Sequence, residues 1–135
     1  MIMKKIFSVL AVALIFVMVG CSTQNNAKLD GEWLITNACG VNTQGGDSDA
    51  FINFDGNGKV NGNATVNTFF GSYTTSGNTL TFGTMGMTRM MGGSMKMEDA
   101  ITDALNNTAT WEVNNDEATI FNKEGKPVMT LKRKK

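Results

Sequence analysis

Apolar and polar residues alternate along most of the chain from Leu29 onward, with a period of two. Such alternation is typical of strands with one buried face, and runs rich in Gly, Asn and Asp separate the successive segments. The predicted strands span residues 32–36, 50–55, 59–66, 69–75, 79–84, 109–113, 117–122 and 127–133. The predicted turns lie at residues 56–58, 76–78, 114–116 and 123–126.

One segment has the periodicity of a helix instead. Its apolar residues recur at i, i+4, i+7 and i+8, which places them on one stripe. These residues are Met97, Ile101, Ala104 and Leu105. The pattern predicts a helix from about Ser94 to Asn106, with the Ser94 hydroxyl capping an early backbone N–H. Acidic Glu98 and Asp99 lie in its first turns, where negative charge suits the helix dipole.

The order of these elements, strands followed by one helix and further strands, predicts the fold class. It indicates an α+β domain with an antiparallel curved sheet or partial β-barrel and one packed α-helix. Residues 39–49 form a long polar loop, of a length that is uncommon without a role or disorder. Trp33 and Trp111 are expected to be core or sheet-face aromatics.

The first residues have the pattern of a secretion signal. Lys4 and Lys5 precede an apolar run at residues 6–19, which is shorter than the ~20 residues of a membrane span. The run ends at Gly20-Cys21 and resembles the bacterial lipobox, with Met18 where Leu is usual. The resemblance implies that residues 1–20 are a signal peptide. Cys21 then carries a diacylglycerol on sulfur and an acyl chain on its new amine. An uncleaved anchor helix and an ordinary secretory signal are the alternatives.

This reading predicts a chain attached to lipid through Cys21. Each buried methylene contributes roughly 0.8 kcal/mol, so two or three acyl chains hold a protein on a membrane essentially permanently. Ser22 after the cysteine, by analogy with enteric bacteria, predicts the outer membrane of a Gram-negative cell, facing the periplasm. Residues 21–28 are then a lipidated cysteine and polar tether, and residues 29–135 a single domain, expected to be a monomer.

Charge and residue usage exclude several function classes. Lys and Arg total 12, and Asp and Glu total 12. The body of the chain has no basic patch, so nucleic acid is not expected as a partner. The basic end at residues 132–135 is expected to be solvated. The absence of histidine excludes a Cys/His nucleophile pair, a Ser-His-Asp triad and a His-based zinc site. Cys39, the remaining thiol, is either reactive or, as single cysteines more often are, a small buried residue. No catalytic residue or further cofactor is predicted.

Three segments, at residues 29–35, 60–73 and 80–91, carry a family resemblance. With the acidic helix and paired C-terminal strands, they resemble the META domain, the family of the heat-shock protein HslJ. The matching motif positions are Gly62, Asn67, Gly71, Tyr73, Thr88, Arg89, Met90 and Met91. Val66 and Gly92 stand where the family often has cysteines, so the usual cysteine pair is absent.

The resemblance implies a β-rich domain with one helix, without established enzymatic activity. Such domains are common in Gram-negative lipoproteins and envelope proteins, some of them linked to stress, motility or virulence. The fold is also similar to that of secretion-pilot lipoproteins, which hold a hydrophobic cleft for lipid or a partner peptide. The expected function is therefore a non-enzymatic envelope lipoprotein, a binding or stress-related structural module.

A methionine-rich segment between the last central strand and the helix is the main candidate site. Its members are Met85, Met87, Met90, Met91, Met95 and Met97. Packing under the helix is the favoured interpretation, because methionine fills irregular cores well. Capture of Cu(I) by thioethers is an alternative, although the sequence predicts no metal. A third interpretation is that the methionines line an adaptable groove for a small apolar ligand or an envelope protein. The protein would then be a lipid- or peptide-binding pilot-like carrier.

Other polar groups carry weaker signals. The acidic stretch at residues 47–58 fails the calcium-loop pattern, because Phe51 occupies a ligand position. Glu98, Asp99 and Asp103 could form a carboxylate pair, but we expect them on a water-exposed helix face. The Gly-Gly-Ser at residues 92–94 is a weak candidate for anion binding at a helix N-terminus.

Overall fold

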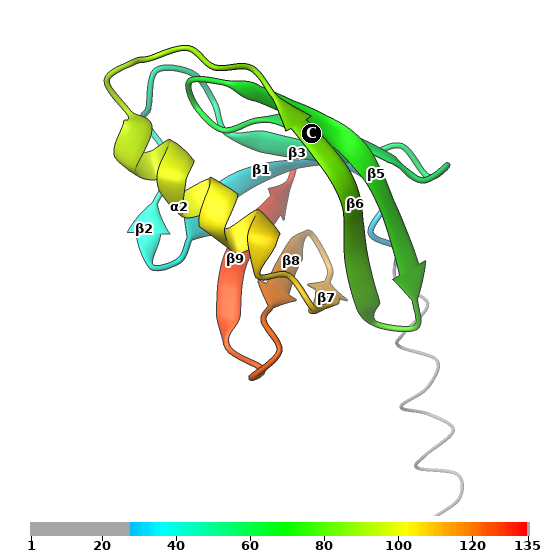
Figure 1. Ribbon diagram of the computed structural model, residues 1–135. Coiled ribbons are helices and arrows are strands. Elements are labelled where there is room, and N and C mark those ends of the chain that lie inside the picture. Colours follow the sequence, from blue (N-terminus) through cyan, green and yellow to red (C-terminus); the bar gives the residue numbers. More distant parts are fainter. Residues whose placement is uncertain (1–27, 135) are drawn as a thin grey trace, which may run out of the picture.

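The computed structural model describes residues 28–134 and consists of strands around a central core with one helix beside them (Figure 1). The predicted signal peptide, Cys21 and residues 22–27 of the predicted tether lie outside the described residues. The elements are β1 (Gly31–Ala38), β2 (Val41–Asn42), β3 (Phe51–Phe54), β4 (Lys59–Asn63), β5 (Thr68–Ser76), β6 (Thr79–Met87), α2 (Met95–Asn106), β7 (Thr110–Asn114), β8 (Glu117–Phe121) and β9 (Pro127–Arg133). Within residues 28–134, no helix is long and apolar enough to cross a bilayer.

The sheet is antiparallel and closes on itself. Each strand from β3 to β9 pairs with the next along the chain, and β1 pairs with both β3 and β9. Strand β2 adds only a two-residue pairing to the end of β1, so the other eight strands form the closed barrel. The predicted antiparallel sheet with one packed helix is confirmed, and the sheet is a complete barrel rather than a partial one.

The structure contains the predicted strands, but their ends differ from the predicted ones. Two of these differences affect the methionine-rich segment. Strand β6 continues to Met87, because Met85 and Met87 pair with Gly71 and Phe69 of β5. Strand β4 stops at Asn63 instead of reaching residue 66, because Thr65 has a φ of 83° and turns the chain sharply. The methionines of β6 therefore belong to the barrel wall, and not to a loop.

Large apolar side chains fill the barrel interior. Trp33, Phe54 and Phe69 are each 1% exposed or less, and Ile101 of α2 is completely covered. The Trp33 indole N–H donates to the Leu29 carbonyl at 2.8 Å, which satisfies its polar atom in the core. Trp33 is thus a core aromatic as predicted, whereas Trp111 is only half-buried.

The basic C-terminal end is ordered against the barrel. The Arg133 guanidinium lies 3.9 Å from the centre of the Trp33 ring and donates to the Asp30 carbonyl at 2.6 Å. Lys134 forms an ion pair with Glu32 at 2.7 Å. The prediction of a solvated end is confirmed for Lys132 and Lys134, which are exposed, whereas Arg133 is half-buried because β9 pairs with β1 and brings it onto the Trp33 side chain.

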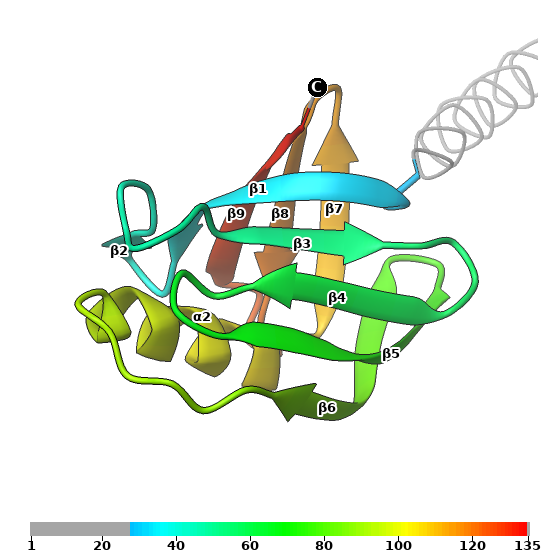
Figure 2. The same cartoon turned by 90° about the horizontal axis from the view of Figure 1, so that it is seen from above.

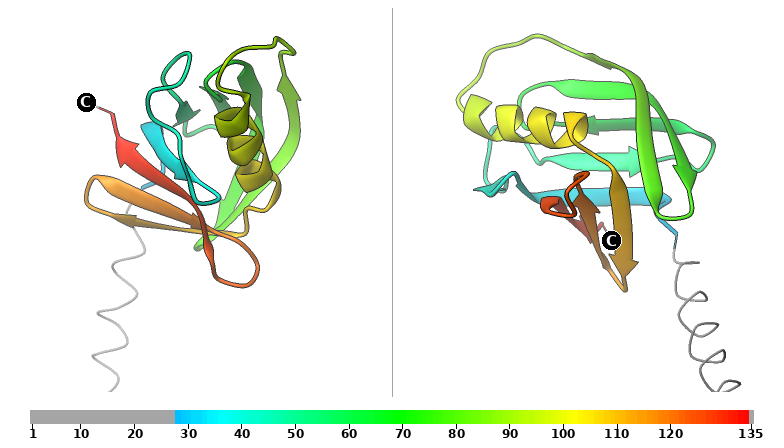
Figure 3. Two further views of the ribbon diagram at one scale, coloured as in Figure 1. Left: turned by 90° about the vertical axis from the view of Figure 1, so that its left-hand side faces the viewer. Right: turned by 60° about the horizontal axis from the view of Figure 1, so that its bottom comes forward.

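The strand pairing of the barrel wall is weakest between β6 and β7. The two strands pair only through Thr79 and Thr110, whereas β6 pairs with β5 up to Met87. Helix α2 lies across the opening beyond that pair, against β1, β2 and β9 (Figures 2 and 3). The edge of β6 that follows Leu80 therefore faces the helix instead of another strand.

We predict that Gly62→Ala disrupts the barrel. Gly62 of β4 is paired with Ile52 and Phe69 on its two sides, and a Cβ built there would overlap the Phe51 carbonyl and the Phe69 ring. The substitution should lower the free energy of unfolding by about 3 kcal/mol or more in urea titration. Gly93→Ala is the matched control, because its Cβ meets only an Asp47 side-chain oxygen at 3.3 Å. Equal stability of the two variants would contradict the packing described here.

Candidate functional site

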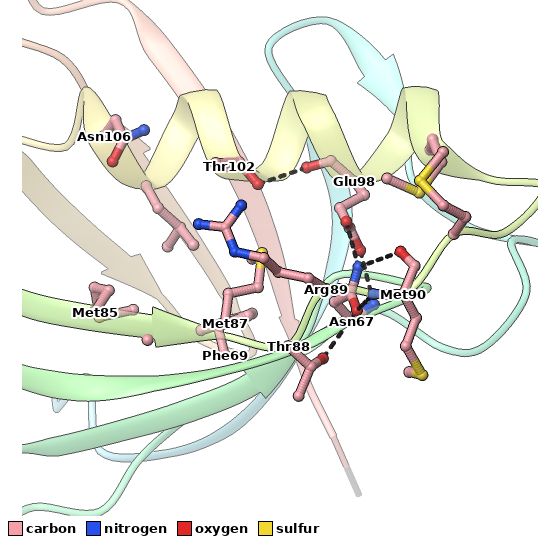
Figure 4. A pocket seen from close by; sticks show the side chains of 14 residues that line it. Asn67, Phe69, Met85, Met87, Thr88, Arg89, Met90, Glu98, Thr102 and Asn106 are labelled. Carbon is pink, nitrogen blue, oxygen red and sulfur yellow. Dashed lines mark hydrogen bonds between the residues drawn. The ribbon is translucent and has the colours of Figure 1, made fainter.

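A cavity of about 420 Å³ lies between the end of β6, the loop that follows it and α2 (Figure 4). Its wall is mostly apolar, and the polar side chains among its residues are spread along it rather than gathered at one side. The lining residues are Asn67, Phe69, Met85, Gly86, Met87, Thr88, Arg89, Met90, Met91, Met95, Glu98, Thr102, Leu105 and Asn106. The cavity lies where β6 is no longer paired with β7. Helix α2 covers only part of this opening in the barrel wall.

Five of the six predicted methionines line this cavity, and Met97 does not. Met97 points toward the loop before β3, where a Cβ built on Gly46 would lie 3.0 Å from its sulfur. Met90 is 56% exposed and Met91 is 86% exposed. The expected packing under the helix is therefore wrong for Met90 and Met91, because the loop carries them to the mouth of the cavity.

Asn67 holds this region together through all its polar groups. Its main-chain N–H and its Nδ2 each donate to a Glu98 carboxylate oxygen, both at 2.7 Å. Its Nδ2 also donates to the Met90 carbonyl at 3.0 Å, and its Oδ1 accepts from the Met90 N–H at 2.6 Å and the Thr88 hydroxyl at 2.9 Å. Its own carbonyl accepts from the Ala64 N–H at 2.8 Å. One buried amide thus joins the turn after β4, the methionine loop and α2.

Glu98 corrects the prediction of an exposed acidic face. It is only 4% exposed, although Asp99 and Asp103 are exposed as expected. A buried carboxylate is costly unless it is hydrogen-bonded, and the two bonds from Asn67 supply those partners. The sequence could not show this, because Glu98 and Asn67 lie on different elements and meet only in the fold. No carboxylate pair for acid–base chemistry results.

The start of α2 is capped differently from the prediction. The Ser94 side chain makes no capping bond to the helix. Its hydroxyl donates to the Thr65 hydroxyl at 3.0 Å and accepts from the Asp47 N–H at 3.0 Å. The Asp47 carboxylate in turn accepts from the Gly93 N–H at 3.0 Å. A side chain of the protein therefore already occupies the place where an anion was considered.

The positions linked to the missing cysteine pair lie side by side. A Cβ built on Gly92 would be 3.0 Å from a Val66 methyl carbon. Cys39 lies elsewhere and is exposed, with a positive φ of 46°. The interpretation of Cys39 as a small buried residue was wrong. Partial desolvation and, less strongly, the nearby Asp103 carboxylate raise the pKa of Cys39, which disfavours the nucleophilic thiolate.

The described residues provide no acidic or thiol metal site. Across residues 28–134, no group of three His, Cys, Asp or Glu side chains comes together as a metal centre. In Figure 4, Met85, Met87 and Met90 are spread along the cavity wall, and the Met90 thioether points away from the helix. The site is therefore an apolar space bordered by hydrogen-bonding and charged side chains.

One family profile matches the chain, and solved structures of low sequence identity share its fold. The META domain family profile matches residues 26–135. An NMR structure of a protein from Burkholderia xenovorans has a TM-score of 0.64 at 20% identity, covering 84% of this chain and 88% of that one. A crystal structure of a DUF4847 family protein from Bacteroides vulgatus has a TM-score of 0.58 at 13% identity, covering 78% of this chain and 94% of that one. No curated protein sequence matches the chain.

We predict that Asn67→Ala strongly destabilises the domain. It removes one bond to the buried Glu98 carboxylate and leaves the Met90 N–H and carbonyl without their side-chain partner. The free energy of unfolding should fall by about 3 kcal/mol, measured by urea denaturation. Asn61→Ala, on the exposed face of β4, makes the same chemical change and should cost less than about 0.5 kcal/mol. A loss of similar size in both variants would refute the role assigned to Asn67.

Proposed function

This chain is a member of the META domain family, and we propose that it is a lipid-anchored, non-enzymatic binding module. Its ligand is a small apolar molecule held in the cavity between β6 and α2. The observation that carries the proposal is that cavity, whose volume of about 420 Å³ falls in the range of small-molecule sites, roughly 300–1,000 Å³. The remainder of the barrel is filled by its own side chains.

The methionines support a binding role over a purely structural one. Thioether side chains are flexible and polarisable, so they adapt to ligands of different shape. Met90 and Met91 are exposed next to each other at the cavity mouth, which leaves apolar surface in water. Such surface is unfavourable in a free monomer and is typical of interaction sites. A ligand in the cavity would cover part of it.

The proposed anchor would hold the cavity away from the membrane surface. Lipid on Cys21 would leave a tether at residues 22–28, which spans at most about 25 Å when extended. The domain begins at the start of β1, and the start of α2 lies at the opposite end of the molecule (Figure 2). The cavity would therefore open into the periplasm, on the outer-membrane location that Ser22 favours.

Cu(I) binding is a second candidate, supported by the gathering of five thioethers around one cavity. Against it stand the exposure of Met90 and Met91 and the spread of the labelled methionines along the wall. A Cu(I) titration read by native mass spectrometry separates the two functions. Retention of one ion per chain, lost in a Met85→Leu/Met87→Leu variant, would favour the copper function.

We predict that an apolar fluorescent probe binds in this cavity. Met90→Asp/Met91→Asp places charge at the mouth of the cavity and should weaken binding of the uncharged dye Nile red at least about tenfold by fluorescence titration. The control is Phe70→Asp, since Phe70 is 57% exposed on β5 and does not line the cavity. Unchanged binding in the methionine variant, or an equal loss in the control, would contradict the proposed site.

We predict that Cys21→Ser abolishes membrane attachment. Without the thiol no diacylglycerol can be added, so incorporation of labelled palmitate should stop and the chain should leave the outer-membrane fraction. Ser22→Ala keeps the thiol and should behave as the unmodified chain. Palmitate labelling and fractionation that do not change in Cys21→Ser would rule out the proposed anchor.

A further inference from the structure

We infer that the ligand of this cavity is an anionic amphiphile, with an unbranched acyl chain among the methionines and a carboxylate on Arg89. The inference rests on the proposed function and specifies its ligand class. It is carried by one juxtaposition, an unpaired guanidinium on the wall of a mostly apolar cavity.

The apolar part of the cavity suits a flexible chain. Phe69 and Leu105 are almost fully covered, and the partly exposed Met85, Met87 and Met95 line the space around them. The cavity volume of about 420 Å³ lies in the range of sites that take small molecules, roughly 300–1,000 Å³, so it has room for an acyl chain of moderate length. A linear acyl chain also follows an elongated wall formed by a strand on one side and a helix on the other.

Arg89 supplies the charge for a head group. It is exposed, and it forms no hydrogen bond or ion pair with any residue in 28–134. In Figure 4 its side chain extends along the cavity toward Thr102 of α2, with the guanidinium at the helix side. A guanidinium presents parallel N–H donors that match a carboxylate in a bidentate pair. A neutral ligand would leave these donors bonded to water alone.

The other charged groups near the cavity do not compete for this role. Glu98 also lines the cavity, but both its oxygens accept bonds from Asn67, and the carboxylate is buried behind them. Asp99 and Lys96 are exposed on α2 and do not line the cavity. Arg89 is therefore the charged group of the wall whose hydrogen-bonding atoms are free, and its sign selects an anionic head.

The experiment uses the membrane-purified chain in lipid nanodiscs with photoreactive dodecyl probes. Each probe carries a diazirine near the end of its chain and a carboxylate, a hydroxyl or an ammonium as its head. Cross-links are mapped by peptide mass spectrometry, which distinguishes the cavity from the lipid-facing part of the chain. The variants are Arg89→Gln and Arg89→Lys, with Lys96→Gln as the matched control outside the cavity.

The carboxylate probe should label residues of the cavity most strongly. Arg89→Gln should lower that labelling about fivefold, the size of a partly exposed ion pair, while Arg89→Lys retains most of it and Lys96→Gln all of it. Equal labelling by the hydroxyl and carboxylate probes, or no effect of Arg89→Gln, overturns the inference and leaves the cavity function standing. Failure of every probe to label the cavity overturns both.

Discussion

The Asn67 side chain connects three parts of the molecule that strand pairing leaves apart. Its bonds to Glu98 reach α2, and its bonds to Met90 and Thr88 reach the segment after β6. The barrel wall between β6 and β7 is joined by a single residue pair, so the sheet alone does not hold the helix over that opening. The buried amide and carboxylate do so, and they also fix Met90 at the cavity, whereas Met85 and Met87 are held by the pairing of β6 with β5. A fully satisfied polar network of this kind rigidifies a site and specifies one arrangement.

The cavity follows from how an antiparallel barrel and a helix share one opening. A closed sheet satisfies every interior edge, but β6 separates from β7 after Leu80, whose N–H still donates to the Ala109 carbonyl at 3.0 Å, and presents an unpaired edge beyond it. Helix α2 shields that edge from solvent with Ile101, Ala104 and Leu105, which pack into the core. Helix α2 is a straight cylinder of roughly 10 Å diameter, and β6 runs away from β7 at an angle to it. The helix therefore does not fill the opening near Met85 and Met87, and space remains there. Methionine is well suited to such a wall, because its unbranched side chain adapts to the space available.

The loop after β6 lacks the cysteine pair that is usual in the family. Val66 and Gly92 are neighbours, at the two positions where the cysteines would stand. In this chain, hydrogen bonds around them fasten the loop instead, from Asn67 on one side and from Asp47 to Gly93 on the other.

Local patterns in the sequence determined the strands, the turns, the single helix and membership of the family. Period-two alternation and the i, i+4, i+7 stripe depend only on neighbouring residues, which is why Ile101, Ala104 and Leu105 were correctly placed in the core. The tertiary structure decided whether the sheet closed, because the pairing of β1 with β9 joins opposite ends of the domain. It also decided that Glu98 is buried, since its partner Asn67 lies on a distant turn and an acidic residue in a first helical turn ordinarily indicates solvent. The same holds for the methionines: their spacing shows that they are close in the chain, but only the divergence of β6 from β7 places five of them around one cavity.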